Sequence, residues 1–473
     1  MKNPLAIWKN LSIQVKSSIV FLIATMTLKG LVFLTTPIFT RIMSEVDMGL
    51  VGTYNSWKGI FETFAIFSLT SAGVFNVGMS QYRDNRDKYI SNMICLCACS
   101  AILTGGVVIL FYNQISSLLK MPLSLVILMV LYAMIMPEQS FWIAKQRYEY
   151  KYKTAFFVVV FSALLSQVMA VVMVIASTER LGVLRLWASA MVELPIGMFF
   201  VIYLLKKGKS FFDITIWKNT LIFAIPLIPH YLSSTVLTAS DRIMINILDS
   251  EAAAGIYTVV YGVGAIGSVI WGAIQGSLTP FIYDKMDNDD LMGITEVTEK
   301  SVMGFGLLCM AESLIAPEIM MVMGPEAYSS GVYAIPPVVG AIFVSCLYNI
   351  FASIEFYNKK TSFITLASIT AALLNIILNL ILIPIFGFVA AGYTTLASYI
   401  VLASMHYINM KRVEKRKIFN EKRLFAVSGI FLVACILPTA LYNLKYVRYG
   451  VCVAIAVIAI VKRNYIIEIF KKD

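Results

Sequence analysis

Histidine is scarce in this chain, with only His230 and His406 among 473 residues. The sequence also lacks the serine elbow of hydrolases and the glycine-rich loop that cradles a nucleotide phosphate. These absences argue against hydrolytic chemistry and against a nucleotide-driven pump. We therefore expect a protein that is not an enzyme and that needs no cofactor.

Charged residues make up only 14% of the chain, whereas 59% of its residues are hydrophobic. All seven cysteines fall within apolar segments, so they do not indicate a disulfide framework. Cys95, Cys97 and Cys99 are close in sequence, but Cys97 points away from the other two on a helix, which is unfavourable for the converging ligands of zinc. We predict no metal site.

Apolar segments long enough to cross a bilayer dominate what remains. Windows of about 20 apolar residues predict an all-α polytopic membrane protein with about fourteen transmembrane helices. The windows are 17–38, 51–78, 90–112, 122–143, 154–177, 183–205, 215–239, 254–281, 300–323, 331–354, 362–384, 387–409, 424–443 and 446–461. Most of the 38 Lys and Arg residues fall in alternate short loops, which predicts that both termini are cytoplasmic.

The net charge of +11 raises the question of nucleic-acid binding. The densest basic run, at 411–423, lies directly between two predicted spans. Such juxtamembrane clusters set topology and contact anionic lipid. We predict a membrane-lipid partner and no nucleic acid.

A short sequence repeat suggests how the spans are grouped. Thr40-Arg41-Ile42-Met43, followed by Gly49 and Tyr54, is matched by Asp241-Arg242-Ile243-Met244, followed by Gly255 and Tyr257. Both occur at the outer end of the first helix of a six-helix unit. We predict an N-terminal bundle at 1–210, a second at 211–410, and a basic cytoplasmic loop with two additional helices at 411–473.

Six ionisable side chains lie deep inside the apolar windows: Lys29, Lys58, Glu62, Glu138, Glu193 and Glu312. Each costs about 2.5 to 3.5 kcal/mol if it faces lipid at mid-membrane. They are therefore expected to face one another or a wet cavity. Lys58 and Glu62, at i and i+4, can form an ion pair on one helix face.

Three blocks of sequence carry a family resemblance: Lys29-Gly30 to Pro37 with Thr40-Arg41, Gly49 and Tyr54; Pro226, Pro229, His230, Ser240-Asp241-Arg242, Gly255 and Tyr257; and Asn375, Asn379, Pro384, Gly387, Ala391-Gly392 and Tyr399. Together they resemble the bacterial polysaccharide flippases of the multidrug/oligosaccharidyl-lipid/polysaccharide exporter superfamily. Ala390 departs from the glycine often found there. The resemblance implies export of undecaprenyl-diphosphate-linked oligosaccharide repeat units across the bacterial cytoplasmic (inner) membrane.

Such a substrate gives the cations a role. We hypothesise that Lys29 and Lys58 contact the pyrophosphate and that Arg41 and Arg242 lie at the outer mouth of the cavity. Helix-end capping and inter-lobe locking are the alternative for the two arginines. Tyr257, Tyr261 and Gln275 are assigned to the glycan, with interhelical packing as the alternative.

The buried carboxylates suit transport energetics. Glu62, Glu138, Glu193 and Glu312 can exchange protons or bind sodium as two bundles rock to alternate access. Pro137 and Pro195, beside two of them, are expected to kink their helices. Candidate protein partners are a glycan polymerase and a chain-length regulator. A multidrug cation antiporter, with an acidic aromatic cavity, and a non-transporting scaffold for a glycan polymerase remain alternative functions.

Overall fold

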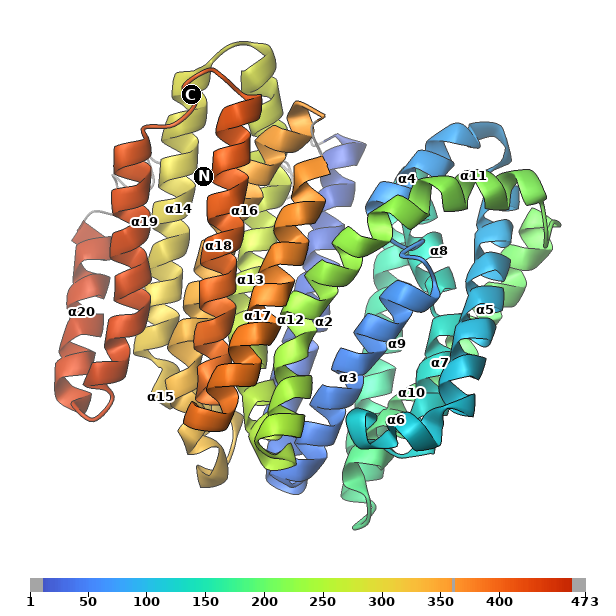
Figure 1. Ribbon diagram of the computed structural model, residues 1–473, viewed down its shortest axis with the longest axis horizontal. Helices are drawn as coiled ribbons and strands as arrows, with labels where there is room; N and C mark the ends of the chain where they lie inside the picture. Colours follow the sequence, from blue (N-terminus) through green and yellow to red (C-terminus); the bar gives the residue numbers. More distant parts are fainter. Residues whose placement is uncertain (1–11, 360–361, 462–473) are drawn as a thin grey trace. The chain divides into compact units, whose positions relative to one another are not determined.

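The computed structural model describes residues 12–359 and 362–461 and contains helices without any β-strand in those ranges. The predicted all-α class is therefore confirmed. The chain divides into two compact units, residues 1–255 and 256–473. Each unit is a bundle of packed helices, shown in Figure 1.

Unit 1 contains eleven α-helices within its described residues, and α13 crosses into unit 2. They are α2 (Ile13–Ile42), α3 (Glu45–Ala65), α4 (Ala72–Gln81), α5 (Arg86–Leu110), α6 (Tyr112–Leu119), α7 (Leu123–Ile135), α8 (Pro137–Tyr148), α9 (Tyr152–Ile175), α10 (Leu181–Gly208), α11 (Ile214–Ala224) and α12 (Ile228–Leu248), then α13 (Glu251–Asp287). Short 3-10 turns lie at Arg83–Asn85 (η1) and Ile225–Leu227 (η2).

Unit 2 continues from α13 with seven further α-helices in the part that the structure describes. They are α14 (Leu291–Leu314), α15 (Ala316–Met323), α16 (Ile335–Tyr357), α17 (Ser362–Phe386), α18 (Val389–Val413), α19 (Glu421–Ile436) and α20 (Lys445–Val461). The 3-10 segments η3 (Glu326–Ala334) and η4 (Leu437–Leu441) precede α16 and follow α19.

Length and apolarity qualify many of these helices as membrane spans. Ten continuous helical segments are long and apolar enough to cross a bilayer, and the α14–α15 pair, bent by 62°, makes up to eleven within the described residues. The chain is thus a multi-pass membrane protein. The other predicted windows coincide with α3, α18 and α20, so the count of fourteen stays a prediction.

The repeated glycines of the sequence meet in unit 1. A Cβ on Gly49 in α3 would lie 2.0 Å from the Glu251 carbonyl oxygen, and a Cβ on Gly255 in α13 would lie 1.9 Å from the Glu45 carbonyl oxygen. Only glycine allows these two backbones to approach so closely. The repeat motif therefore marks a reciprocal helix contact.

One predicted membrane segment of unit 1 is broken and another is briefly interrupted. The predicted span 51–78 is broken between α3 and α4, where Phe67 and Ser68 both have left-handed backbones, with φ of 53° and 54°. Within 122–143, α7 ends at Ile135 and α8 begins at Pro137, although Leu123–Tyr148 still runs as one span. We call this one-residue interruption the α7–α8 break. By contrast, α10 continues as one helix through Pro195.

Two buried asparagines of unit 2 form hydrogen bonds in its core. Asn375 donates to Thr395 Oγ1 and Asn379 donates to Asn375 Oδ1, joining α17 to α18. The last two helices pack on α14, as Figure 1 shows for α19. Buried Arg448 of α20 donates to the Leu314 carbonyl beside the α14–α15 bend and pairs with Glu318.

Candidate functional site

Unit 1 encloses a polar cavity of about 750 Å³. Its walls come from α3, the α3–α4 break, the α7–α8 break, α9, α10 and α12, with Leu28 contributed by α2. The lining is Leu28, Lys58, Gly59, Glu62, Thr63, Ile66, Ser68, Thr70, Ser71, Tyr132, Met136, Pro137, Glu138, Gln139, Ser140, Val159, Ser162, Ala163, Glu193, Ile196, Gly197, Phe200, Tyr231, Ser234, Thr235 and Thr238. We call this space the unit 1 cavity.

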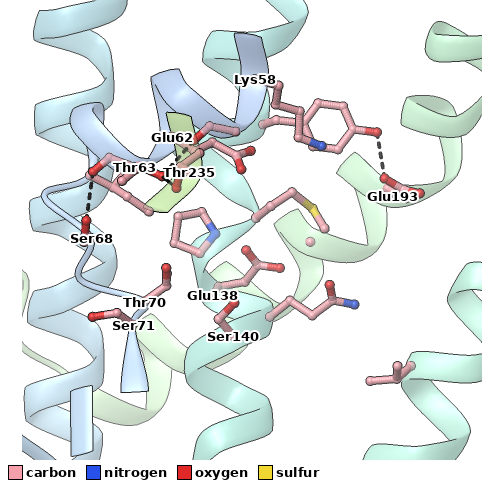
Figure 2. Close-up of a pocket in the computed structure, with 18 of the residues that line it drawn as sticks. Lys58, Glu62, Thr63, Ser68, Thr70, Ser71, Glu138, Ser140, Glu193 and Thr235 are labelled. Carbon is pink, nitrogen blue, oxygen red and sulfur yellow. Dashed lines mark hydrogen bonds between the residues drawn. The ribbon is translucent and has the colours of Figure 1, made fainter. Parts of the chain in front are cut away.

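Lys58 is held at one wall by an aromatic ring. Its ammonium lies 3.7 Å from the centroid of Tyr132, a geometry that stabilises a desolvated cation. The Tyr132 hydroxyl donates to Glu193 Oε2 at 2.7 Å, and Ser166 donates to Glu193 Oε1 at 2.6 Å. These contacts, partly visible in Figure 2, fix a Lys58–Tyr132–Glu193 network across α3, α7 and α10.

Glu138 occupies a different environment at the start of α8. It is 1% exposed, and neither carboxylate oxygen has a hydrogen-bond partner. Figure 2 shows its side chain entering the space near Thr70, Ser71 and Ser140. An unpartnered ionised carboxylate is costly to bury, so this position requires a proton or a bound cation.

Another part of the cavity lining consists largely of hydroxyl groups. Thr63 of α3 and Thr235 of α12 share a hydrogen bond of 3.1 Å. At the α3–α4 break, the Ser68 hydroxyl and the Ser68 backbone N–H both donate to the Thr63 carbonyl. The irregular backbone of this segment is thus satisfied within the protein while it borders a polar space.

Four of the predicted site residues meet in this cavity: Lys58, Glu62, Glu138 and Glu193. Lys58 and Glu62 share the cavity-facing side of α3, but the ammonium of Lys58 contacts Tyr132, and the described ion pairs do not include one between Lys58 and Glu62. The lining therefore combines one lysine with three glutamates.

The predicted cations outside this cavity have other contacts. Lys29 is exposed on α2 and is absent from the cavity lining. Arg41 donates to the Pro37 carbonyl at 2.8 Å, whereas Arg242 donates to Ser56 Oγ at 3.0 Å and to the Thr238 carbonyl at 2.9 Å. All of these printed contacts lie within unit 1, and the roles predicted for the two arginines stay predictions.

The remaining predicted residues belong to unit 2. Tyr257 is fully buried, with its ring centroid 6.5 Å from that of Tyr261. Gln275 donates to Asn349 Oδ1 at 3.2 Å. Glu312 Oε1 of α14 is buried without a partner, and Glu312 Oε2 lies 3.5 Å from the position that a Cβ on Gly267 would take on α13. Tyr261 lies on the same helix as Tyr257, whereas the Gln275–Asn349 hydrogen bond joins α13 to α16, and the glycan assignment of these residues stays a prediction.

Sequence reasoning missed the groups that organise the cavity. Tyr132 looked like an ordinary apolar-span residue, although it bridges Lys58 and Glu193. Ser68, Thr70 and Ser71 were hidden in a predicted continuous span. Their clustering beside Gly73 in an apolar window is the signal that could have revealed the broken helix.

The long apolar helices and the cavity among those of unit 1 describe a polytopic membrane protein with a polar interior space. The chain belongs to the polysaccharide biosynthesis protein family, which matches residues 14–286. The resemblance inferred from the sequence motifs is thereby confirmed at the level of family. A search of curated proteins found no match.

Solved structures show the same fold at low sequence identity. The lipid II flippase MurJ in an inward closed conformation aligns with a TM-score of 0.67 and 15% identity, covering 95% of this chain and 100% of that one. An inward-facing multidrug resistance MATE transporter of the MOP superfamily aligns with a TM-score of 0.58 and 13% identity, covering 83% of this chain and 96% of that one. A MOP superfamily transporter from Pyrococcus furiosus aligns with a TM-score of 0.51 and 13% identity, covering 86% of this chain and 96% of that one.

Proposed function

We propose that this protein translocates polyprenyl-diphosphate-linked oligosaccharide units from the cytoplasmic to the outer leaflet of a bacterial cytoplasmic membrane. The observation that carries the proposal is the polar unit 1 cavity, in a chain of the polysaccharide biosynthesis family. A glycan headgroup must cross the membrane away from lipid, and only a wet polar space inside the protein offers that route.

The lining chemistry suits a hydroxyl-rich cargo. Thr63, Ser162 and Thr238 donate to carbonyls of their own helices, so their oxygens remain as acceptors for sugar hydroxyls at the cavity wall. Tyr132 adds a ring and a phenol. The volume of about 750 Å³ lies in the range of small-molecule sites, which fits a few sugar rings.

Ion coupling is assigned to the cavity carboxylates. Glu138 is the foremost candidate because it is buried without a hydrogen-bond partner, and Glu62 and Glu193 line the same space. A proton or a sodium ion that neutralises Glu138 would lower the cost of burying it, so occupancy of this site would be coupled to the conformation of the α7–α8 break.

The architecture proposed for transport has fourteen membrane helices, cytoplasmic termini and two bundles that rock about a central site. The basic loop between α18 and α19 supports this sidedness because cationic loops stay on the cytoplasmic face. Lys29 remains proposed as a second cation on the substrate path. A glycan polymerase and a chain-length regulator remain proposed partners.

The acidic lining favours one second candidate, a multidrug cation antiporter. Three glutamates and Tyr132 provide the acidic and aromatic groups that bind an organic cation, whereas the positive charge of Lys58 beside Tyr132 opposes cation binding. Cationic-dye efflux from expressing cells that depends on Glu138 would support this candidate.

Reconstitution separates the two functions. Purified protein in liposomes is given either a lipid-linked oligosaccharide or a cationic dye, under an imposed proton or sodium gradient. The flippase proposal expects gradient-dependent movement of the oligosaccharide and none of the dye. Dye movement alone would favour the antiporter.

A further inference from the structure

A second pocket of about 500 Å³ opens in unit 1 beside the cavity. It is lined by Thr70, Phe75, Asn76, Ser140, Ile143, Ala144, Arg147, Tyr148 and Tyr150. Thr70 and Ser140 also line the unit 1 cavity, so the two spaces adjoin at the α3–α4 break. We call this second space the arginine pocket.

The two spaces differ in charge. The arginine pocket contains one guanidinium, Arg147, and no carboxylate among its lining residues. The unit 1 cavity contains Lys58 with three glutamates. An anion entering unit 1 therefore finds its favourable electrostatic environment in the arginine pocket rather than around Lys58.

Arg147 is available for a ligand. Its guanidinium lies 4.5 Å from the ring centroid of Phe21, a neutral partner, and the described ion pairs do not include it. The residue is exposed within a pocket wall. Its planar fork matches phosphate oxygens in a bidentate manner.

Aromatic and polar groups frame the guanidinium. The Tyr148 hydroxyl donates to the Asn76 carbonyl at 3.3 Å, and Arg86 lies 5.1 Å from the centroid of the same ring. Tyr150 has a left-handed backbone, with φ of 53°, and its N–H bonds the Arg147 carbonyl. This turn places two tyrosines beside the arginine, a combination that suits a phosphorylated sugar.

We infer that the arginine pocket binds the diphosphate of the lipid-linked substrate, with Arg147 as its principal ligand, before the glycan enters the unit 1 cavity. The inference rests on the proposed flippase function and moves diphosphate recognition from Lys29 and Lys58 to Arg147. The basic residues around the α8–α9 turn, including Lys151 and Lys153, place this pocket at the cytoplasmic end of unit 1.

Binding to the full-length protein in detergent tests the inference. The probes are geranylgeranyl diphosphate, geranylgeraniol and inorganic pyrophosphate, measured by isothermal titration calorimetry. We expect the diphosphate to bind more tightly than the alcohol, and Arg147→Gln to weaken it about tenfold or more, as for loss of a charge-assisted pair. Arg147→Lys should retain part of the affinity because one donor remains.

Arg83→Gln is the matched control, because Arg83 is an exposed arginine of unit 1 that lines neither pocket. It should bind geranylgeranyl diphosphate like the unaltered protein. Competition by inorganic pyrophosphate would show recognition of the anion itself; dependence on Arg147 without such competition would show that the lipid-borne diphosphate is required.

Equal affinity of Arg147→Gln, shown to be folded by its thermal unfolding midpoint, and of the unaltered protein would overturn the inference. A loss of affinity in Arg147→Gln that only equals the loss in Arg83→Gln would also overturn the inference. If oligosaccharide translocation in liposomes persists in that case, the flippase proposal stands alone. Failure of the unaltered protein to translocate would instead contradict the flippase proposal.

Discussion

Adding one methyl group at Gly49 probes the reciprocal helix contact of unit 1. In Gly49→Ala the new Cβ would lie 2.0 Å from the Glu251 carbonyl oxygen. A comfortable carbon–oxygen contact is about 3.3 Å, so α3 and the first turn of α13 must separate by about 1.3 Å. The clashing atoms are backbone, which no side-chain rotation can relieve.

The expected cost follows from two opposing effects. Overpacking costs up to about 3 kcal/mol, and replacing glycine by alanine within a helix returns about 1 kcal/mol. We expect Gly49→Ala to lower the free energy of unfolding by about 2 kcal/mol, with Gly255→Ala similar, because its Cβ would lie 1.9 Å from the Glu45 carbonyl oxygen.

Unfolding by titration with sodium dodecyl sulfate from mixed micelles measures this difference. Gly106→Ala in α5 is the control, since a Cβ there would find nothing within 4 Å and gains only the helix-propensity effect. A Gly49→Ala protein as stable as Gly106→Ala would refute the close-contact argument.

Three further predictions concern Glu138, the Arg448–Glu318 pair and the Arg416–Glu414 pair. Glu138→Gln should leave the protein folded but remove the dependence of liposome transport on the ion gradient; unchanged gradient dependence would exclude Glu138 from coupling. Glu318→Ala should lower the free energy of unfolding by about 3 kcal/mol in the same titration, because it leaves the Arg448 guanidinium, which is 3% exposed, without its ionic partner. Arg448→Ala should cost less, because the remaining Glu318 side chain is 36% exposed. The reverse order would contradict this. The hydrogen bond from Arg416 holds the pKa of Glu414 below its usual range, so this pair stabilises the fold above the unfolded pKa of about 4.5 and loses its effect as pH falls further. The melting temperature of Arg416→Ala should accordingly decline less as pH falls below about 4.5 than that of the unaltered protein, and an equal decline would contradict this.

Hydropathy located the membrane segments because burying a long apolar run dominates their energetics. It could not reveal the break after Ala65, since Ile66, Phe67 and Leu69 keep the window apolar while the backbone turns. Only the position of neighbouring helices makes the left-handed conformations of Phe67 and Ser68 tolerable.

Helical spacing predicted the cavity face of α3, where Lys58 and Glu62 both line the space. The threonines of α2 show the limit of such spacing. Thr25 and Thr36 donate to carbonyls one turn back, at Phe21 and Val32, so these hydroxyls are satisfied within their own helix. A polar stripe alone therefore cannot distinguish a cavity wall from a self-satisfied helix face.

Partners across helices were beyond the sequence. Lys58 has Glu62 one turn away, yet its ammonium lies over Tyr132 of α7, and Tyr132 in turn bonds Glu193 of α10. Such a network depends on helix crossing angles and distances that no spacing rule contains. Arg147 was likewise counted only as a loop charge, because its pocket is formed by segments distant in the chain.

Translocation of a defined lipid-linked oligosaccharide in proteoliposomes tests the central claim most directly. Oligosaccharide that reaches the opposite leaflet is cleaved by a membrane-impermeant glycosidase. The account predicts protein-dependent cleavage that rises with an imposed proton or sodium gradient and is lost in Arg147→Gln. Cleavage no faster than in protein-free liposomes, with correctly inserted and folded protein, would contradict it.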